Sequence, residues 1–248
     1  MLVRNYREWD GHWIMPGLDT AIYKYMEITK FLSLIQKNAL YLSRISKLAD
    51  PFEGTLTKQH AAYINSNMPG GILARKRMRE NTFVSCWFSG KFMSNAMWQI
   101  YGLSAASVMI KSSVGRLLEA LPRLRDDDHC HAGMVKYTDY EAGHPQFARS
   151  NRFGILFTKS VHLAFEEEFR LAVWSGRSWT TTAARGWKPK GSSVSQVGLS
   201  IPVDIPTLIE EVTVNPGAEN WVHDVIEASI KCFSPDIPLR KIVMVPIL

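Results

Sequence analysis

Short strand-like segments and helical segments follow one another irregularly along the whole chain. β-branched and aromatic residues predict strands at 22–26, 39–45, 82–88, 107–112, 134–140, 168–174, 197–204, 209–215 and 240–248. Apolar residues at helical spacing and capping signals predict helices at 28–38, 55–66, 72–80, 94–102, 114–121 and 218–233. Because regular strand–helix–strand repeats are missing, we expect an α+β fold with mixed, mainly antiparallel sheets and flanking helices.

The chain is large enough for one sizeable core, which we expect to be a single domain. It has 248 residues and a formal net charge of +6. We expect an N-terminal arm at 1–21 and one domain at 22–248. The charged N-terminus does not look like a signal peptide, and no apolar run reaches the length of a membrane span. We therefore expect no membrane partner. Three widely spaced cysteines predict no disulfide framework, which favours the cytoplasm.

The segment AFEEEFRLAV at 164–173 places three carboxylates inside an apolar stretch. As a strand, it would carry Glu166, Glu168 and Arg170 on one face, with the two carboxylates about 7 Å apart. Such a pair suits sugar hydroxyls and a developing positive charge, and Arg170 would keep one carboxylate ionised. As the start of a helix, the same segment would only pair Glu166 with Arg170 on a solvated face. Both interpretations remain open at this point.

Other polar and aromatic residues have similar alternatives. Ser85 in strand 82–88 either leaves room for a ligand or bonds a neighbouring backbone group. Trp98 and Tyr101 share one face of helix 94–102, as core residues or as a stacking platform. The turn ADPFEG at 49–54 presents Asp50, Phe52 and Glu53, and its aspartate could simply bond its own backbone.

Two stretches bear on metals and nucleic acid. DDDHCH at 126–131 lacks a second ligand pair at metal-site spacing, so we expect a solvated loop and no metal. Basic residues gather in helix 72–80, and Arg185 and Lys188 flank Trp187 in a loop at 175–196. Cations mixed with aromatic residues suit single-stranded nucleic acid. A solvated helix face and a flexible loop are the alternatives.

Four motifs together resemble the bacterial domain-of-unknown-function 2971 family over about residues 22–248. They are Tyr23-Lys24-Tyr25, Asp50-Pro51-Phe52-Glu53, Met97-Trp98-x-x-Tyr101 and Glu166-x-Glu168-x-Arg170. Ala49 stands where the family usually has asparagine. The family name carries no activity.

The order of strands also resembles ADP-ribosyltransferases. That resemblance implies a split sheet around a cleft, with Lys24 contacting NAD and Ser85 shaping the nicotinamide pocket. It implies that Glu168 stabilises the ribosyl cation and that Glu166 orients or deprotonates the acceptor. Arg170 would fix the pair, and Tyr23, Tyr25, Trp98 and Tyr101 would bind the cofactor. Lysine replaces the usual arginine or histidine, and Ser-Cys-Trp replaces Ser-Thr-Ser.

The resulting hypothesis is an ADP-ribosyltransferase or NAD glycohydrolase with NAD as substrate. A toxin or anti-phage effector that modifies nucleic acid or protein would fit it, by family analogy alone. Asp50, Phe52, Glu53, Arg185, Trp187 and Lys188 would then bind the second substrate. A non-catalytic nucleotide or nucleic-acid binding module is the first alternative. The second is a metal-dependent nuclease built on Asp50, Glu53, Glu166 and Glu168.

Overall fold

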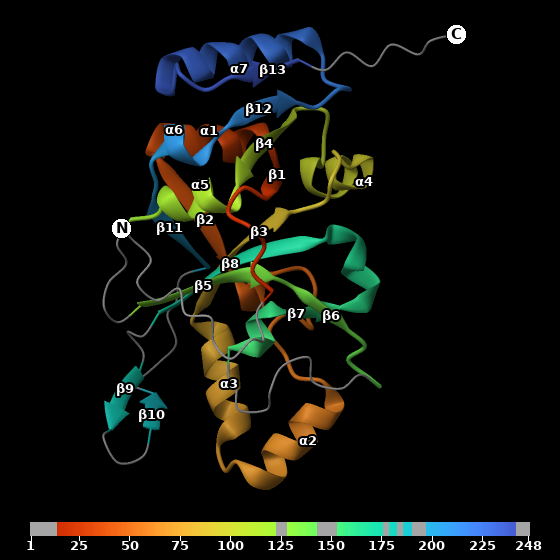
Figure 1. The fold of residues 1–248 in the computed structure, drawn as a ribbon, viewed down its shortest axis with the longest axis vertical. Helices are drawn as coiled ribbons and strands as arrows, with labels where there is room; N and C mark the ends of the chain where they lie inside the picture. Colours follow the sequence, from red (N-terminus) through yellow and green to blue (C-terminus); the bar gives the residue numbers. More distant parts are fainter. Residues whose placement is uncertain are drawn as a thin grey trace.

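The computed structural model describes residues 14–122, 128–142, 153–175, 179–182, 186–189 and 197–241 (Figure 1). Strands and short helices fill this part of the chain. The strands are β1 (Ala21–Glu27), β2 (Ala39–Arg44), β3 (Thr82–Phe88), β4 (Ser107–Ser113), β5 (Asp128–Met134), β6 (Lys136–Thr138), β7 (Thr158–Ser160), β8 (Glu168–Ser175), β9 (Trp179–Thr182), β10 (Gly186–Pro189), β11 (Gly198–Pro202), β12 (Glu211–Val214) and β13 (Leu239–Arg240).

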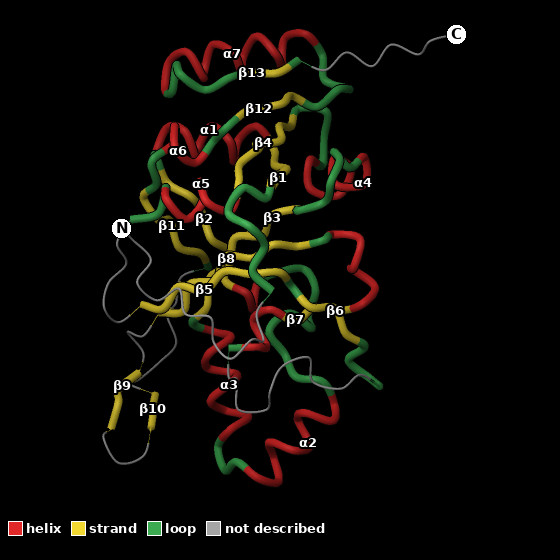
Figure 2. Tube along the Cα trace, viewed as in Figure 1, coloured by secondary structure: helices red, strands yellow, loops and turns green. Residues whose placement is uncertain are grey.

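The α-helices lie between these strands, as Figure 2 shows in red. They are α1 (Ile28–Lys37), α2 (Lys58–Asn67), α3 (Gly71–Glu80), α4 (Asn95–Met97), α5 (Val114–Glu119), α6 (Ile205–Leu208) and α7 (Asn220–Phe233). Shorter turns are the 3-10 helices η1 (Ile45–Lys47), η3 (Gly154–Phe157) and η4 (Val161–Glu166), and a π-helical turn, η2 (Trp98–Gly102). None of the described helices is long and apolar enough to span a membrane.

Within the described residues, a nine-stranded sheet runs in the order β11-β2-β3-β1-β4-β12-β13. Beside this path, β8 pairs with β3 and with β5. All of these pairings are antiparallel except that of β12 with β13. The expected α+β class with a mainly antiparallel sheet is therefore confirmed.

The sheet divides at β3. One edge of β3 pairs with β8 along its whole length. Its other edge pairs with β2 at Phe83 and Val84 and with β1 only at Phe88. Because β1 and β2 meet the same edge of β3 at different points, the sheet branches into two parts there.

Alternating side chains give the sheet two different faces. The largest core packs Ile22, Phe83, Trp87 and Leu171 against apolar residues of α1, α5, α6 and α7. On the other face, Val84, Ala172 and Trp174 pack against η1, α3 and η3. A third cluster on that face joins Tyr25 and Phe88 to Met97 and Trp98. The site described below lies on this second face.

Three sequence predictions need correction. The segment 126–131 is not a loop in its described part, because 128–131 belongs to β5 and pairs with β8. The expected strand at 134–140 is divided, since β5 ends at Met134 and β6 begins at Lys136. The loop expected at 175–196 contains the β9–β10 hairpin. The expected arm at 1–21 is described only from residue 14, and Leu18 O accepts from Gly115 N at 2.7 Å.

Candidate functional site: a buried charge cluster

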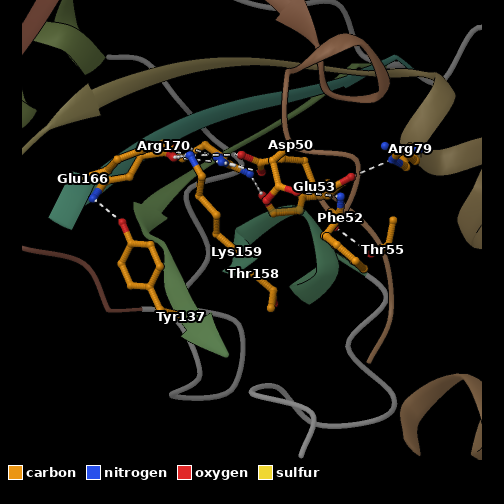
Figure 3. A network of polar contacts seen from close by, with 12 residues as sticks. Asp50, Phe52, Glu53, Thr55, Arg79, Tyr137, Thr158, Lys159, Glu166 and Arg170 are labelled. Carbon is orange, nitrogen blue, oxygen red and sulfur yellow. Dashed lines mark hydrogen bonds and ion pairs between the residues drawn. The ribbon is translucent and has the colours of Figure 1, made fainter. Parts of the chain in front are cut away.

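Five charged side chains from four segments meet on the second face of the sheet, and Figure 3 labels four of them. They form the charge cluster: Glu53, Lys159, Glu166, Glu168 and Arg170. All five are buried, with exposed fractions between 0 and 5%. The Lys159 ammonium lies 2.5 Å from Glu166, 3.1 Å from Glu53 and 3.2 Å from Glu168. A buried group of three carboxylates and two cations is costly to desolvate. Short, well-aligned ion pairs and hydrogen bonds are needed to offset this cost.

Arg170 is the best-satisfied member of the charge cluster. Its guanidinium donates to both oxygens of Glu168, at 2.5 Å through Nε and at 2.9 Å through Nη2. It also donates to Glu53 at 2.8 Å and to the Leu156 carbonyl at 2.8 Å. This planar, bidentate arrangement is the geometry in which arginine binds carboxylate most strongly. The predicted pairing of Arg170 with the carboxylates is therefore present, but in the interior and not on a wet surface.

Glu53 enters the cluster from the Asp-Pro turn. Asp50 Oδ1 accepts from Phe52 N at 2.9 Å, the aspartate turn that the sequence predicted. Gly54 follows with a φ of +68°, a conformation that glycine adopts without steric cost. Arg79 of α3 fixes the outer side of the turn, because it donates to the Glu53 carbonyl at 2.6 Å. The turn thus directs the Glu53 carboxylate inward, while Asp50 stays outside the cluster.

Glu166 and Glu168 do not share a strand face, contrary to the sequence prediction. Glu166 ends η4, and β8 begins only at Glu168. Between them, Glu167 adopts a left-handed conformation with a φ of +37°. Ser89 holds this corner, because its N–H and hydroxyl both donate to the Glu167 carbonyl, at 3.0 and 2.7 Å. The two carboxylates meet on Lys159 through this corner and not through strand alternation.

The environment shifts the pKa values of Glu166 and Glu168 in opposite directions. Burial alone would raise the pKa of Glu168, but Arg170 and Lys159 outweigh it and lower the pKa to about 2. Burial raises the pKa of Glu166, and the nearby Lys159 only partly offsets this effect. Burial would lower the pKa of Lys159, but Glu168 and Glu53 raise it above its ordinary value. Glu168 is therefore fixed as an anion, and Glu166 takes up a proton more readily than Glu168 does.

Two tyrosines contact the cluster. Tyr137 of β6 accepts from Glu168 N through its hydroxyl, at 2.9 Å. Tyr101 of η2 interacts with the Glu166 carboxylate through a side-chain hydrogen bond. Burial raises the pKa of the Tyr101 hydroxyl, although 36% of the residue is exposed. Tyr101 therefore connects the buried Glu166 with the protein surface.

Lys24 and Ser85 contact each other but lie on the opposite face of the sheet from Glu168. Lys24 Nζ donates to Ser85 Oγ at 3.2 Å and to the Cys86 carbonyl at 2.9 Å. Ser85 pairs with Leu171, which belongs to the largest core, whereas Arg170 pairs with Cys86. Burial lowers the pKa of Lys24. The expectation that these two residues form one group with Glu166 and Glu168 is therefore wrong. Lys24 contacts Ser85, whereas Glu166 and Glu168 both contact Lys159.

The expected aromatic residues lie together on the cluster's side of the sheet. Tyr25 and Trp98 are buried and pack edge to face, with ring centroids 4.9 Å apart. Tyr25 also accepts from Ser94 N at 3.0 Å. Tyr23 and Phe88 are neighbours across β1 and β3, and Phe88 pairs in turn with Glu168. Tyr25 and Trp98 have core neighbours in this structure, and their role in cofactor binding stays a prediction.

The residues expected to bind a second substrate are divided. Phe52 stacks on Tyr140 with ring centroids 5.1 Å apart, and 47% of it is exposed. Trp187 and Lys188 belong to β10, which contacts α3. Arg185 lies outside the described residues. Three basic residues of α3 differ in their environment. Arg75 is buried, Arg79 binds the Asp-Pro turn, and Lys76 is exposed.

No group of three or more His, Cys, Asp or Glu side chains in the described parts of the chain could hold a metal ion. In the charge cluster, each of the three carboxylates is already paired with Lys159, and two of them also with Arg170. His129 and His131 of β5 stack on each other with centroids 6.5 Å apart. The described residues therefore offer no set of metal ligands for the metal-dependent nuclease that the sequence left open.

Sequence reasoning missed Lys159 as a site residue and missed the charge of Glu53 as the partner of Arg170. Lys159 is the single cation in the apolar stretch 153–165 other than His162, which is a signal that could have drawn attention to it. A lysine inside a buried stretch needs carboxylate partners. Glu166, seven residues later, is one of them.

The comparisons with known proteins found no match by sequence and weak similarity to solved structures. No protein-family model and no curated protein matches the chain, so the resemblance to the domain-of-unknown-function 2971 family is not confirmed. Two solved structures of DarT from Thermus sp. 2.9 are similar, each with 14% identity. The complex with carba-NAD+ has a TM-score of 0.42 and covers 92% of this chain and 97% of DarT. The complex with ADP-ribosylated ssDNA has a TM-score of 0.41 and covers 98% of each chain.

Proposed function

We propose that the charge cluster carries out N-glycosidic bond cleavage on NAD, as an ADP-ribosyltransferase or NAD glycohydrolase. The observation that carries this proposal is the opposite shift of two neighbouring carboxyl groups. Glu168 stays ionised, with a pKa of about 2, whereas the pKa of Glu166 is raised. Environments that push the pKa values of a carboxyl pair apart are typical of acid–base assignments in enzymes. NAD as the substrate follows from the sequence resemblance to ADP-ribosyltransferases.

The reaction divides between the two carboxylates. The bond between ribose C1 and the nicotinamide nitrogen breaks, and its electron pair leaves with nicotinamide. The remaining ribosyl group resembles an oxocarbenium ion, which the negative potential of Glu168 stabilises. An acceptor hydroxyl or amine, or water, then attacks C1 and gives its proton to Glu166. The raised pKa of Glu166 suits this last step, because the carboxylate must accept a proton.

A nucleic-acid acceptor is the finer part of the proposal. The net charge of +6 favours an anionic partner. The contact between α3 and β10 brings the basic helix next to the strand to which Lys188 belongs. An oligonucleotide incubated with the protein and NAD should gain the mass of one ADP-ribose, read by mass spectrometry. Release of nicotinamide without any gain in mass would leave NAD hydrolysis as the activity.

Release of free nicotinamide from NAD tests the cleavage step, and transfer of ADP-ribose to the acceptor by Glu166→Gln tests the role of Glu166. Glutamine keeps the shape of the carboxyl, and Lys159 keeps Glu53 and Glu168 as charged partners, so the variant should fold. Transfer to the acceptor should fall by roughly 10² to 10⁴-fold, the usual contribution of a general base. Glu167→Gln, its exposed neighbour, is the matched control and should keep full activity. A folded Glu166→Gln protein with unchanged transfer would contradict the assignment.

A structural role of the cluster is the second candidate, and one observation favours it. Both oxygens of Glu168 are bound by Arg170, and one of them also lies 3.2 Å from Lys159. A carboxylate so well paired serves folding in a non-catalytic nucleotide or nucleic-acid binding module. In that case no nicotinamide is released by the native protein, whereas Glu168→Gln still lowers its stability.

A further inference from the structure

Helix α7 carries two apolar stripes. The inner stripe packs into the largest core and consists of Val222, Ile226 and Ile230. The other, here called the outer stripe, is exposed and consists of Trp221, Val225, Ala228 and Cys232. Trp221 is 60% exposed and Val225 is 41% exposed. A helix that packs on a sheet needs only one apolar face, so the outer stripe calls for another partner.

The spacing of the outer stripe indicates what kind of partner it fits. Its residues follow one another at intervals of four, three and four positions. This is the seam at which two helices pack side by side in a coiled coil. In Figure 1, α7 lies at one end of the molecule, beyond β12 and β13.

The charges beside the outer stripe determine the orientation of the second helix. Asp224 and Lys231 flank the stripe on the same side, seven residues apart, and both are exposed. In a parallel pair of identical helices, each of these residues would lie beside the residue five positions further along the other helix, so Asp224 would face an uncharged serine and gain no charged partner. In an antiparallel pair, Val225 packs on Ala228 of the other helix, and Asp224 lies opposite Lys231. In the single chain, the exposed Lys231 ammonium pairs with Glu227 of its own helix at 2.6 Å. In the dimer, it can turn to Asp224 of the second helix.

We propose that the outer stripe of α7 binds the same stripe of a second copy of this chain, in antiparallel orientation about a two-fold axis. The resulting dimer has two Asp224–Lys231 pairs at its rim and a Trp221–Cys232 contact at each end. One helix per partner buries less area than a standard protein interface. The dimer is therefore expected to dissociate in the micromolar range, as small interfaces do, on the order of 10⁻⁶ to 10⁻⁴ M.

Sedimentation equilibrium of the full chain tests this dimer. Over roughly 1 to 200 μM, the concentration range of such small interfaces, the mass should rise from 28.1 kDa toward twice that value. Val225→Glu places a charge in the centre of the seam and should weaken association at least about tenfold, equivalent to 1.4 kcal/mol. Leu73→Glu, an equally drastic change at an exposed residue of α3, is the matched control and should leave the dimer intact.

A charge exchange tests the orientation. Asp224→Lys and Lys231→Asp should each weaken the dimer, because each places like charges opposite one another. The double variant should restore it, since the pairs are then reversed. A wild-type chain that is monomeric over the whole concentration range, or a dimer that Val225→Glu does not affect, would overturn the proposal. Failure of the double variant to regain affinity would overturn the antiparallel arrangement. All of these variants keep the charge cluster intact.

Discussion

Glu53 and Arg170 are separated by 117 positions in the sequence and form a buried ion pair of 2.8 Å. The pair joins the Asp-Pro turn to the centre of β8. Arg170 is completely buried, so it depends on Glu53 and Glu168 for compensation of its charge. The turn is therefore part of the site and not merely a connection between η1 and α2.

Replacing Glu53 by Gln should strongly destabilise the protein. Breaking one partner of a buried ion pair typically costs about 3 to 5 kcal/mol, because the other charge stays buried without compensation. Urea unfolding followed by circular dichroism measures the loss of unfolding free energy. Glu141→Gln removes the partner of an exposed pair with Lys58 and should cost at most about 1 kcal/mol. Equal effects of both substitutions would contradict the burial of the cluster.

The stability of the protein should fall in acid through Glu168. Its pKa of about 2 in the folded protein lies below the ordinary value of 4.5. A lowered pKa contributes stability that is fully present above pH 4.5 and is lost as the pH falls toward 2. The loss approaches about 1.4 kcal/mol per pH unit for one proton. Unfolding free energies measured between these pH values should show a smaller slope for Glu168→Gln, and an unchanged slope for Glu167→Gln.

Glu168→Gln should also reduce overall stability. The residue is 1% exposed, so its ion pairs are poorly screened by solvent. Activity of this variant must therefore be measured on protein shown to be folded at the assay temperature. A variant with the thermal midpoint of the wild type would show that the carboxylate is solvated.

Tyr101→Phe should shift the pH profile of NAD cleavage or transfer upward. The Tyr101 hydroxyl lowers the pKa of Glu166 through its hydrogen bond, so its removal raises that pKa further. If the ionised form of Glu166 is required, the ascending limb of the profile moves to higher pH. Tyr41→Phe, at another exposed tyrosine, is the control. Carbon-13 NMR of labelled glutamate reads the same shift without any activity, and an unmoved resonance would contradict the contact.

Glu167→Gly should make the protein slightly more stable. Glu167 has a φ of +37°, where glycine is free of the steric cost that other residues meet. The expected gain is up to about 1 kcal/mol in thermal or urea unfolding. Gly54→Ala is the reverse case, since its φ is +68° and a Cβ would lie 3.1 Å from Ile45 Cδ1. That variant should lose stability, and a gain there would contradict both assignments.

The sequence predicted the elements of the fold better than their arrangement. Strand 82–88 and helix 28–38 are recognisable because apolar periodicity is a local property. The branching at β3 is not predictable in this way, since it depends on which strands pair at a distance. The short segment 128–134 became a strand because pairing with β8 outweighs its polar composition.

For the site, the sequence identified Glu166, Glu168 and Arg170 but assumed that a continuous strand connects them. The left-handed Glu167 has no local signal, because its conformation depends on the two hydrogen bonds from Ser89. Lys24 and Ser85 were correctly associated with each other. Their face was not predictable, because alternation fixes faces only within one strand and not between distant strands.

The wide separation of the charge cluster along the chain also affects how the protein folds. In the sequence, Glu53 lies 117 positions before Arg170, whereas Lys159 lies only seven positions before Glu166 and nine before Glu168. Contacts that close such long loops form after the local structure, because loop-closure entropy opposes them earlier. The ion pairs between Glu53 and its partners therefore contribute to the native state more than to the folding transition state. Substitutions at Glu53 should accelerate unfolding more than they slow folding, so the cluster determines how long the native protein persists.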